Sequence, residues 1–463
     1  MSGADKTGAS SPSAAEKRSP RPSVAERKAI GKAMRDRVPR KSHGNWAVDQ
    51  QRDGFLDRLL AAVGGRRADL LKIRWGRMAA SPFGFYRGAA ALMAADLGPL
   101  PSSGLEVQVC GDAHLLNLGA YAAPDGHLVF DLNDFDETCR GPFEWDLKRL
   151  AASVAVGGRY AGHKDSACSD AVRSMVEAYR IGLNTFAETR VLELARYEIT
   201  PRSTKKPLAP IFKAAARNTP EQLLKKATEP TAGGYARFLD KPPLLFRPKA
   251  AEEQGVLASL GPYRSTLGPG RQQVLDGYTP WDVAFKVVGT GSVGVDDYLV
   301  LLYGNGPADP LFLQIKEEDP SCWRPYLKNA STYAQDYPHQ GKRAAEGQFR
   351  TQTVADPFLG WTQIVAKNFI VRQWSDHKAS IDVSMLADGS TVRDYVVLCG
   401  EVLAKAHART GDAAMLAGYC GTSDRLDEDL AVFSLAYADQ TEADHLRLRK
   451  AVKDGKLDAV EGV

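Results

Sequence analysis

Two stretches of this chain decide its fold: VCGDAHLLNLG at residues 109–119 and LVFDLNDFDETCRGPFEWDLKRL at residues 128–150. The alternating pattern of LEVQVCGD predicts a strand that runs into the first stretch, and HLVFDLND predicts a second strand that runs into the acidic residues of the other. Helical periodicity follows in EWDLKRLAASVAVGG. The chain therefore gathers several carboxylates at the exits of two predicted strands, beside a glycine and an asparagine.

Asp112 and Asn117 have the D-x-x-x-x-N spacing of a phosphotransferase catalytic loop. In such a loop the Asp accepts the proton of the attacking hydroxyl, and the Asn side chain holds Mg²⁺. Because Mg²⁺ prefers oxygen ligands, a second carboxylate must enter from a neighbouring strand, and Asp134 is the predicted donor. Asp131 is a rival metal ligand, and Asp136 is a candidate ligand for a second metal ion. His114 is expected to orient the loop.

A glycine-rich turn appears far downstream, in VVGTGSVGV. A strand, VDDYLVLLYG, follows it instead of the helix that a Rossmann dinucleotide site requires. Strand, glycine loop and strand is the kinase arrangement, in which backbone amides freed of Cβ crowding approach phosphates. Lys316 in LFLQIKEE is then expected to contact the phosphates, with Glu346 in RAAEGQF as its ionic partner. The predicted phosphate-binding turn contains Gly289, Gly291, Ser292 and Gly294.

The motifs GDAHLLN, DFDE and GPFEWDL, in this order, resemble the aminoglycoside and choline kinase branch of the protein-kinase-like superfamily. That branch has H-G-D-x-H-x-x-N, then I-D-F-(D/E/G), then a helix that begins D-L-A. The resemblance implies that Asp146 braces the catalytic loop from below. Cys110 departs from the pattern, since it stands where the branch has its first His. LAKAHART, with His407 and Arg409, resembles the helix that runs just before a kinase catalytic loop.

The resemblance implies an α+β, protein-kinase-like fold of two lobes that is circularly permuted, because the glycine loop and lysine follow the catalytic loop. The predicted segments are a disordered basic tail at 1–36, the catalytic-loop part of the large lobe at 37–200 and an irregular connection at 201–279. A β-rich small lobe at 280–378 and closing helices at 379–463 complete the chain. Joins in exposed loops make such a rearrangement physically reasonable.

From about residue 37 onward the chain also resembles a bacterial family of uncharacterised proteins, domain of unknown function 2252. The motifs RMAASPFGFYRGAA, GDAHLLNLG, KVVGTGSVG, LFLQIKEE, DPFLGW and YADQ carry this resemblance. Leu118 departs from it, since Phe is usual there, and so does AAEGQF, where the family is closer to V-V-x-G-Q-R.

Bulk properties set broad limits. The chain has 463 residues, more than one core normally supports, and its 60 basic and 56 acidic residues nearly balance. We therefore expect no nucleic-acid partner. The six cysteines form no C-x-x-C pair, which favours reduced thiols in a cytoplasmic protein. No apolar run is long enough for a membrane span, and no secretory signal is recognisable. The oligomeric state stays open.

The expected function is ATP- and Mg²⁺-dependent phosphoryl transfer to a hydroxyl of an unidentified acceptor, either a small molecule or a protein. A catalytically inactive nucleotide-binding protein and a nucleotidyl transferase are alternatives. A metal-dependent phosphatase is a third, because D-x-H at Asp112 can open a two-metal site, although no G-N-H-E-like block follows. Arg77 and Arg87 flank SPFGFY and are candidates for substrate contact or for structural ion pairs.

Overall fold

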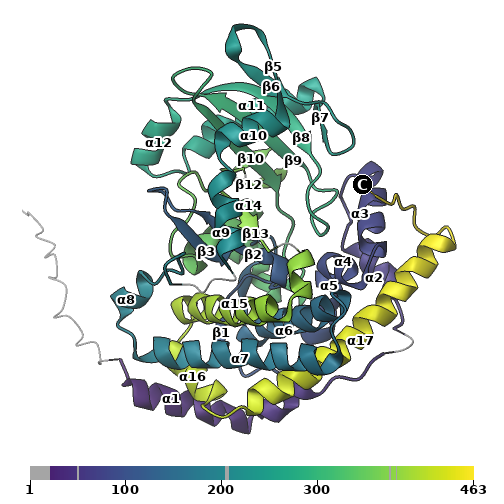
Figure 1. Cartoon of the computed structure of the whole chain (residues 1–463), viewed down its shortest axis with the longest axis vertical. Coiled ribbons are helices and arrows are strands. Elements are labelled where there is room, and N and C mark those ends of the chain that lie inside the picture. Colours follow the sequence, from purple (N-terminus) through teal and green to yellow (C-terminus); the bar gives the residue numbers. More distant parts are fainter. Residues whose placement is uncertain (1–20, 50–51, 204–207, 375–376, 382, 463) are drawn as a thin grey trace, which may run out of the picture.

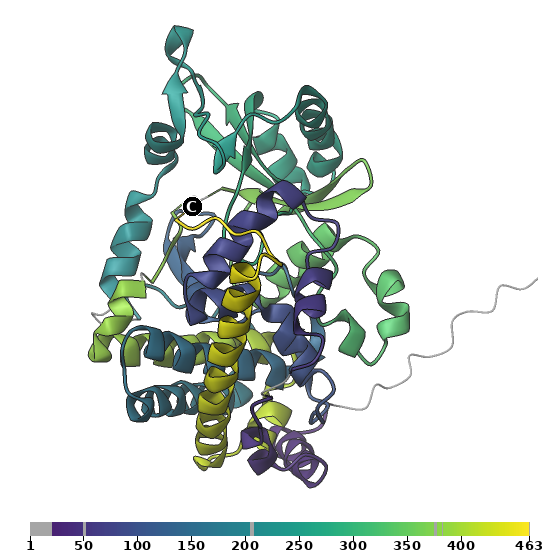
Figure 2. The same ribbon diagram turned by 90° about the vertical axis from the view of Figure 1, so that its right-hand side faces the viewer.

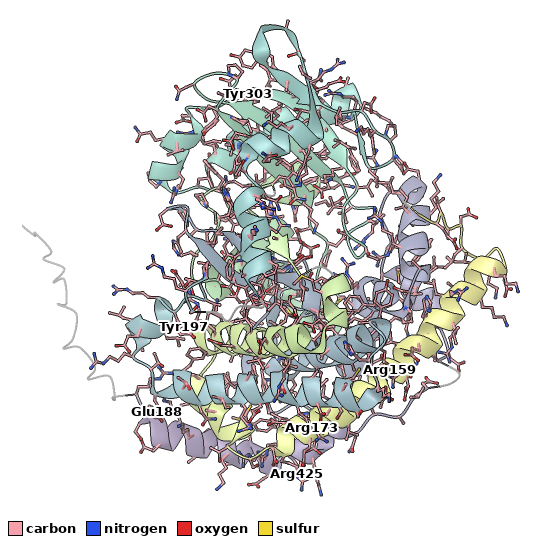
Figure 3. The ribbon with its side chains drawn as sticks, viewed as in Figure 1. Arg159, Arg173, Glu188, Tyr197, Tyr303 and Arg425 are labelled. Carbon is pink, nitrogen blue, oxygen red and sulfur yellow. The ribbon has the colours of Figure 1, made fainter. Side chains whose placement is uncertain are left out.

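A computed structural model describes residues 21–49, 52–203, 208–374, 377–381 and 383–462. A β-rich part, here called the sheet part, lies above a larger helical part (Figure 1). Helices and strands both contribute to the architecture, so the α+β class is confirmed. Figure 3 draws the side chains on this ribbon and labels Tyr303 in the sheet part and Arg159, Arg173 and Arg425 along the lower helices.

The sheet part is built on a six-stranded antiparallel sheet with the order β11-β12-β10-β9-β8-β7. A glycine turn joins β8 to β9, and β10 follows as the third strand of this meander. A helix, α14 (Gln340–Thr351), lies in the chain between β10 and β11 and packs on β11 and β12. The strands are β7 (Leu245–Phe246), β8 (Thr279–Lys286), β9 (Asp297–Tyr303), β10 (Pro310–Glu317), β11 (Gly360–Ile364) and β12 (Lys367–Gln373).

The strands of this sheet alternate between two buried faces. One face carries Phe285, Val300 and Leu313 and packs against α11 (Ala250–Arg264) and α12 (Pro269–Leu275). The other carries Leu299 and Phe312. Short elements cover its far end: α10 (Pro220–Ala227), β5 (Thr228–Pro230) and β6 (Ala236–Phe238). The helix before them, α9 (Ala209–Arg217), packs instead on a small sheet of the helical part.

Long helices form the helical part, and α17 runs along its side (Figure 2). Their apolar faces meet in one core that also holds the strands on either side of the Asp112 loop. The main helices are α6 (Phe143–Tyr160), α7 (Asp165–Glu188), α15 (Gly389–Thr410), α16 (Ala413–Cys420) and α17 (Arg425–Lys453), with the short α8 (Val191–Ala195) after α7. None of the helices in the described residues is long and apolar enough to cross a bilayer.

Two small sheets hold the motif-bearing segments inside the helical part. One pairs β1 (Glu106–Val109) with β4 (Cys139–Pro142). The other has the order β13-β2-β3, with β2 (Leu118–Ala122) between β13 (Ala379–Ser380) and β3 (Leu128–Leu132). The segments after β1 and after β3 therefore emerge close to each other, because β2 begins where the first motif ends and pairs with β3.

Four helices before these strands flank the sheet part and the helical part: α2 (Phe55–Ala61), α3 (Ala68–Ala79), α4 (Pro82–Gly88) and α5 (Ala90–Leu97). The C-terminal segment returns to α3, where the Val460 amide donates to the Lys72 carbonyl at 3.0 Å (Figure 1). Pro82 begins α4 at a position where its missing N–H costs nothing, and the Ser81 side chain caps that helix.

The N-terminal tail is shorter than the sequence predicts. A helix, α1 (Val24–Ala33), begins at a capping box in which Ser23 and Glu26 bond each other's backbone amides. It packs on α16 through glycines: a Cβ at Gly31 would lie 1.9 Å from the Met415 carbonyl oxygen. Disorder through residue 36 is therefore wrong for residues 24–36, while residues 1–20 lie outside the described residues. The connection at 201–279 is also more regular than expected, since it holds α11, a helix of 15 residues.

Candidate functional site

The loop after β1 presents Asp112 and is held from below by Asp146 of α6. The Asp146 carboxylate accepts the backbone N–H of Cys110 at 2.7 Å and that of Gly111 at 2.9 Å. Gly111 has φ +83° and a Cβ there would lie 2.1 Å from the Glu137 carbonyl oxygen, so this turn requires glycine. The contacts agree with the bracing position that the sequence pattern implies for Asp146.

Arg149, which the sequence analysis did not single out, holds the Asp112 side chain. Its Nε and Nη2 atoms each lie 2.8 Å from Asp112 Oδ1, and its guanidinium stacks 4.0 Å over the Tyr86 ring. Burial raises the pKa of Asp112, the Arg149 charge opposes this rise, and the nearby Asp134 charge adds to it. Asp112 is thus a fixed carboxylate with a pKa above its ordinary value.

Asn117 and His114 shape the same loop. Asn117 Nδ2 donates to the Asp112 carbonyl at 2.8 Å, which leaves its Oδ1 atom as an acceptor, and the residue lines the cleft. His114 Nδ1 accepts the Leu116 amide at 3.2 Å, and its Nε2 lies 4.0 Å from Asp112 Oδ2. Burial lowers the pKa of His114 well below its usual value, so it is a neutral loop residue.

Asp134 and Asp136 follow β3 and meet Lys316 of β10. The Lys316 ammonium pairs with the Asp136 carboxylate, and the Asp136 amide lies 3.4 Å from Asp134 Oδ1. Burial opposes the charge on Asp136, but Lys316 holds the pKa of Asp136 below its ordinary value. Burial raises the pKa of Asp134, as does the adjacent Asp136 charge. Two residues far apart in the chain, Lys316 and Asp134, thus belong to one cluster.

The glycine turn between β8 and β9 is tied to the helical part by arginines. Arg66 Nη1 donates to the Gly291 carbonyl at 2.5 Å, Arg74 Nη1 donates to the Thr290 carbonyl at 2.8 Å, and Arg77 Nη1 donates to the Gly289 carbonyl. Gly289 and Gly294 have φ +68° and +98°, which side chains would strain. Ser292 Oγ donates to the Val288 carbonyl at 3.0 Å and closes the turn. Arg77 is therefore a loop anchor.

Arg87 faces the acidic side of the site. Its Nε atom is buried without a hydrogen-bond partner among the described residues, and the Asp112 and Asp134 charges both act on it. Burial lowers the pKa of Arg87. Its side chain lines the same cavity as those two carboxylates, so Arg87 points to the cleft.

Two sequence predictions fail at this site. Glu346 lies on the outer face of α14, where it pairs with Arg350 at 3.1 Å and with Lys342 at 3.6 Å, so it does not partner Lys316. Asp131 is buried and paired with Lys405 of α15, because its position in β3 faces that helix and not the cleft. Asp131 is therefore unsuited to ligate a metal ion.

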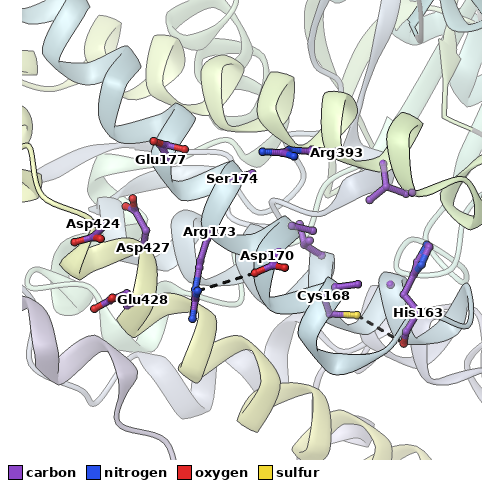
Figure 4. A pocket seen from close by; sticks show the side chains of 16 residues that line it. His163, Cys168, Asp170, Arg173, Ser174, Glu177, Arg393, Asp424, Asp427 and Glu428 are labelled. Atoms are coloured by element: carbon purple, nitrogen blue, oxygen red, sulfur yellow. Dashed lines mark hydrogen bonds and ion pairs between the residues drawn. The ribbon is translucent and has the colours of Figure 1, made fainter.

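The residues around Asp112, Asp134 and the glycine turn surround one cavity of about 700 Å³ between the sheet part and the helical part. Its lining includes Asp112, Asn117, Asp134 and the glycine turn. The volume lies in the range of small-molecule sites. A second cavity of about 490 Å³ lies among α7, α15 and α17 (Figure 4), and it contains none of the predicted site residues.

Oxygen donors suit Mg²⁺ at the first cavity, namely the Asp134 carboxylate and Asn117 Oδ1. Among the described residues, no group of three or more His, Cys, Asp or Glu side chains is arranged as a metal site. One carboxylate and one amide fit a cation that takes its other ligands from phosphates and water.

A segment after β10 completes the floor of the cavity. Trp323 Nε1 donates to the Gly111 carbonyl at 2.7 Å, and its ring stacks on Trp145 of α6 at 4.3 Å. The Ser321 hydroxyl donates to the Glu137 carbonyl at 2.8 Å. The residue before Asp112 is thus packed against a segment from the sheet part.

Comparison with known proteins agrees with the motifs. The family model described as "Uncharacterized protein conserved in bacteria (DUF2252)" matches residues 66–451. The chain belongs to this family. The part matched to DUF2252 begins at Arg66, one of the arginines that hold the glycine turn, and it includes Asp112, Asn117, Asp134 and the whole glycine turn. No curated protein and no solved structure matches the chain.

Proposed function

We propose that this protein is an ATP- and Mg²⁺-dependent phosphotransferase of the protein-kinase-like type, which transfers the γ-phosphoryl group to a hydroxyl of an acceptor. The observation that carries the proposal is the convergence of Asp112, Asn117, Asp134 and the glycine turn on one cavity, with Lys316 paired to Asp136 beside it. These groups are the parts that kinase chemistry requires, since catalysis there consists of positioning and charge stabilisation.

The order of elements in the sheet part supports a kinase-like reading. The glycine turn joins two antiparallel strands, β8 and β9, and the lysine lies on the third strand, β10. A helix, α14, comes next, and β12 then pairs with β10. Protein kinases likewise place a Gly-rich loop over the phosphates and a lysine on the third strand.

The contact between α15 and β1 supports the permuted order. The Gln108 amide of β1 donates to Thr410 Oγ1 at the end of α15 at 3.1 Å, and Arg140 donates to the Thr410 carbonyl at 2.6 Å. The helix that resembles the one before a catalytic loop therefore ends beside the strand that enters this loop, although it comes much later in the chain.

Each group has a role in the proposed reaction. Asp112, fixed by Arg149, accepts the proton of the acceptor hydroxyl, and its raised pKa makes it a stronger base than an ordinary Asp. Asn117 Oδ1 and the Asp134 carboxylate would hold Mg²⁺, whose positive charge would offset the negative charge of the phosphates. The amides of the glycine turn and the Lys316 ammonium bind phosphate oxygens. The Arg87 guanidinium, which lines the same cavity, stabilises the transferred group.

The test uses ATP labelled at the α- or at the γ-phosphate, with Mg²⁺. It follows the ADP that is released when water replaces the acceptor hydroxyl, so the acceptor need not be known. We expect saturable Mg²⁺-dependent ATP binding and slow ADP release, with release lost in Asp112→Asn and retained in the control Asp125→Asn, an exposed carboxylate.

Other outcomes identify the alternatives. Binding without turnover, unchanged by Asp112→Asn, would identify an inactive nucleotide-binding protein. Transfer of the α-label with pyrophosphate release would identify a nucleotidyl transferase. Absence of ATP binding would refute the proposal.

A further inference from the structure

Lys316 and Glu318 project from the same side of the chain at the end of β10. Alternate residues of an extended strand share a face, and the Glu318 amide continues the pairing by donating to the Asn368 carbonyl at 2.8 Å. Glu318 lines the cavity, and its side chain is 1% exposed. An acidic side chain thus lies beside the lysine on the strand itself.

Both carboxylate oxygens of Glu318 are buried without a hydrogen bond among the described residues. Arg343 Nη2 lies 3.7 Å away, but this guanidinium already donates to the carbonyls of Thr138, Asp136 and Asp319 at 2.7–2.9 Å. A buried carboxylate with no donor is costly, and a bound ion is one partner that can satisfy such a group. Glu318 is therefore ready to accept a cation.

The Lys316 ammonium at present neutralises the acidic pair that follows β3. It contacts Asp136, and Asp134 lies next to Asp136. An ammonium is a compact charge on a flexible four-carbon stem, so Lys316 can reach more than one carboxylate. A divalent cation at Asp134 and Asp136 would make this ammonium superfluous there, because a bound ion is the largest local charge in a site.

We propose that Lys316 is an exchangeable counterion: it leaves Asp136 for Glu318 when a divalent cation binds at Asp134 and Asp136. The identity of this cation as Mg²⁺ rests on the proposed function. After the exchange, the Asp136 carboxylate is free to bind the cation, and Glu318 is the ionic partner of Lys316 that Glu346 was expected to be. The lysine is then held on its own strand, pointing to the cavity.

The test measures Mn²⁺, as a probe for Mg²⁺, by the free-ion EPR signal in the absence of nucleotide. Glu318→Gln keeps the shape of a buried side chain whose oxygens make no hydrogen bond among the described residues, so the fold should be kept. It should weaken Mn²⁺ binding about tenfold, because Lys316 loses its second partner. Lys316→Met should strengthen binding about tenfold, since no ammonium competes for the carboxylates. Adding Glu318→Gln to Lys316→Met should change nothing further, and the control Glu346→Gln should match wild type.

Wild-type affinity in Glu318→Gln would overturn the exchange, whether or not Lys316→Met folds. Equal weakening by Glu318→Gln in both backgrounds would overturn it too, since Glu318 would then ligate the ion directly. Absence of Mn²⁺ binding in every variant would also overturn it. Because nucleotide is omitted, the two proposals can fail separately. If the variants change Mn²⁺ affinity as expected but the protein does not bind ATP, only the proposed function is refuted. If the protein turns over ATP but Glu318→Gln leaves Mn²⁺ affinity unchanged, only the exchange is refuted.

Discussion

Replacing Asp146 with Asn is expected to destabilise the protein strongly while leaving the volume of the side chain unchanged. Asp146 is fully buried, and its two oxygens accept the amides of Cys110 and Gly111 at 2.7 and 2.9 Å. The Asn amide offers one oxygen, and its NH₂ group then faces one of these N–H donors. The variant therefore loses a hydrogen bond to a charged group, about 1.5–3 kcal/mol, and leaves a buried N–H unbonded, about 1–3 kcal/mol.

The sum is a loss of about 2.5–6 kcal/mol in the free energy of unfolding, a large share of the 5–15 kcal/mol typical of native proteins. Urea denaturation followed by far-UV circular dichroism measures it as a shift of the midpoint. The matched control is Asp170→Asn on α7, whose side chain is 76% exposed, with an expected change within about 0.5 kcal/mol. If the Asp146 and Asp170 variants unfold at the same midpoint, the bracing role assigned to Asp146 is wrong.

Three further outcomes are expected. Lys405→Met leaves the buried Asp131 carboxylate without its ionic partner and should lower the free energy of unfolding in urea by about 3–5 kcal/mol. Adding Asp131→Asn should restore most of this loss, and an unchanged free energy in Lys405→Met would contradict the buried pair. Arg149→Lys keeps the positive charge but loses the two guanidinium contacts to Asp112, so the rate of ADP release should fall about tenfold at unchanged KM for ATP. An unchanged rate would show that Arg149 does not position Asp112. Burial raises the pKa of Asp297 to about 6 from 3.8, so folding takes up a proton between these values and stability falls as pH rises across them. The free energy of unfolding of Asp297→Asn, minus that of wild type, should therefore rise by about 3 kcal/mol from about pH 4 to about pH 7 in urea titrations. A difference that stays constant with pH would contradict the raised pKa of Asp297.

The local motifs were predictable because their residues are near neighbours in the chain. The approach of Asp146 to the loop before Asp112 follows from a strand, a turn and a helix in sequence, and the strands β1, β3, β8 and β9 follow from the pattern of apolar residues. The family assignment is also confirmed, since the motifs span most of the chain.

Contacts between distant segments were not predictable in the same way. The carbonyl groups of Gly289 and Thr290 take their donors from α3, some two hundred positions earlier, and arginines carry no signal for a particular carbonyl. The failure at Glu346 has a different cause. The sequence around Glu346 has a helical pattern, but the rotation that turns Arg343 inward and Glu346 outward depends on which side of the helix meets the sheet.

The stacked pair Trp145 and Trp323 provides an intrinsic spectroscopic probe of the loop before Asp112. Trp323 bonds the Gly111 carbonyl and lies 4.3 Å from Trp145, so the two indoles are close enough for their electronic transitions to couple. A ligand that shifts the segment around Trp323 must also move either the Gly111 carbonyl or this stack. Near-ultraviolet circular dichroism would then report the state of the loop without any label, and the signal would come from the residue immediately before the proposed base.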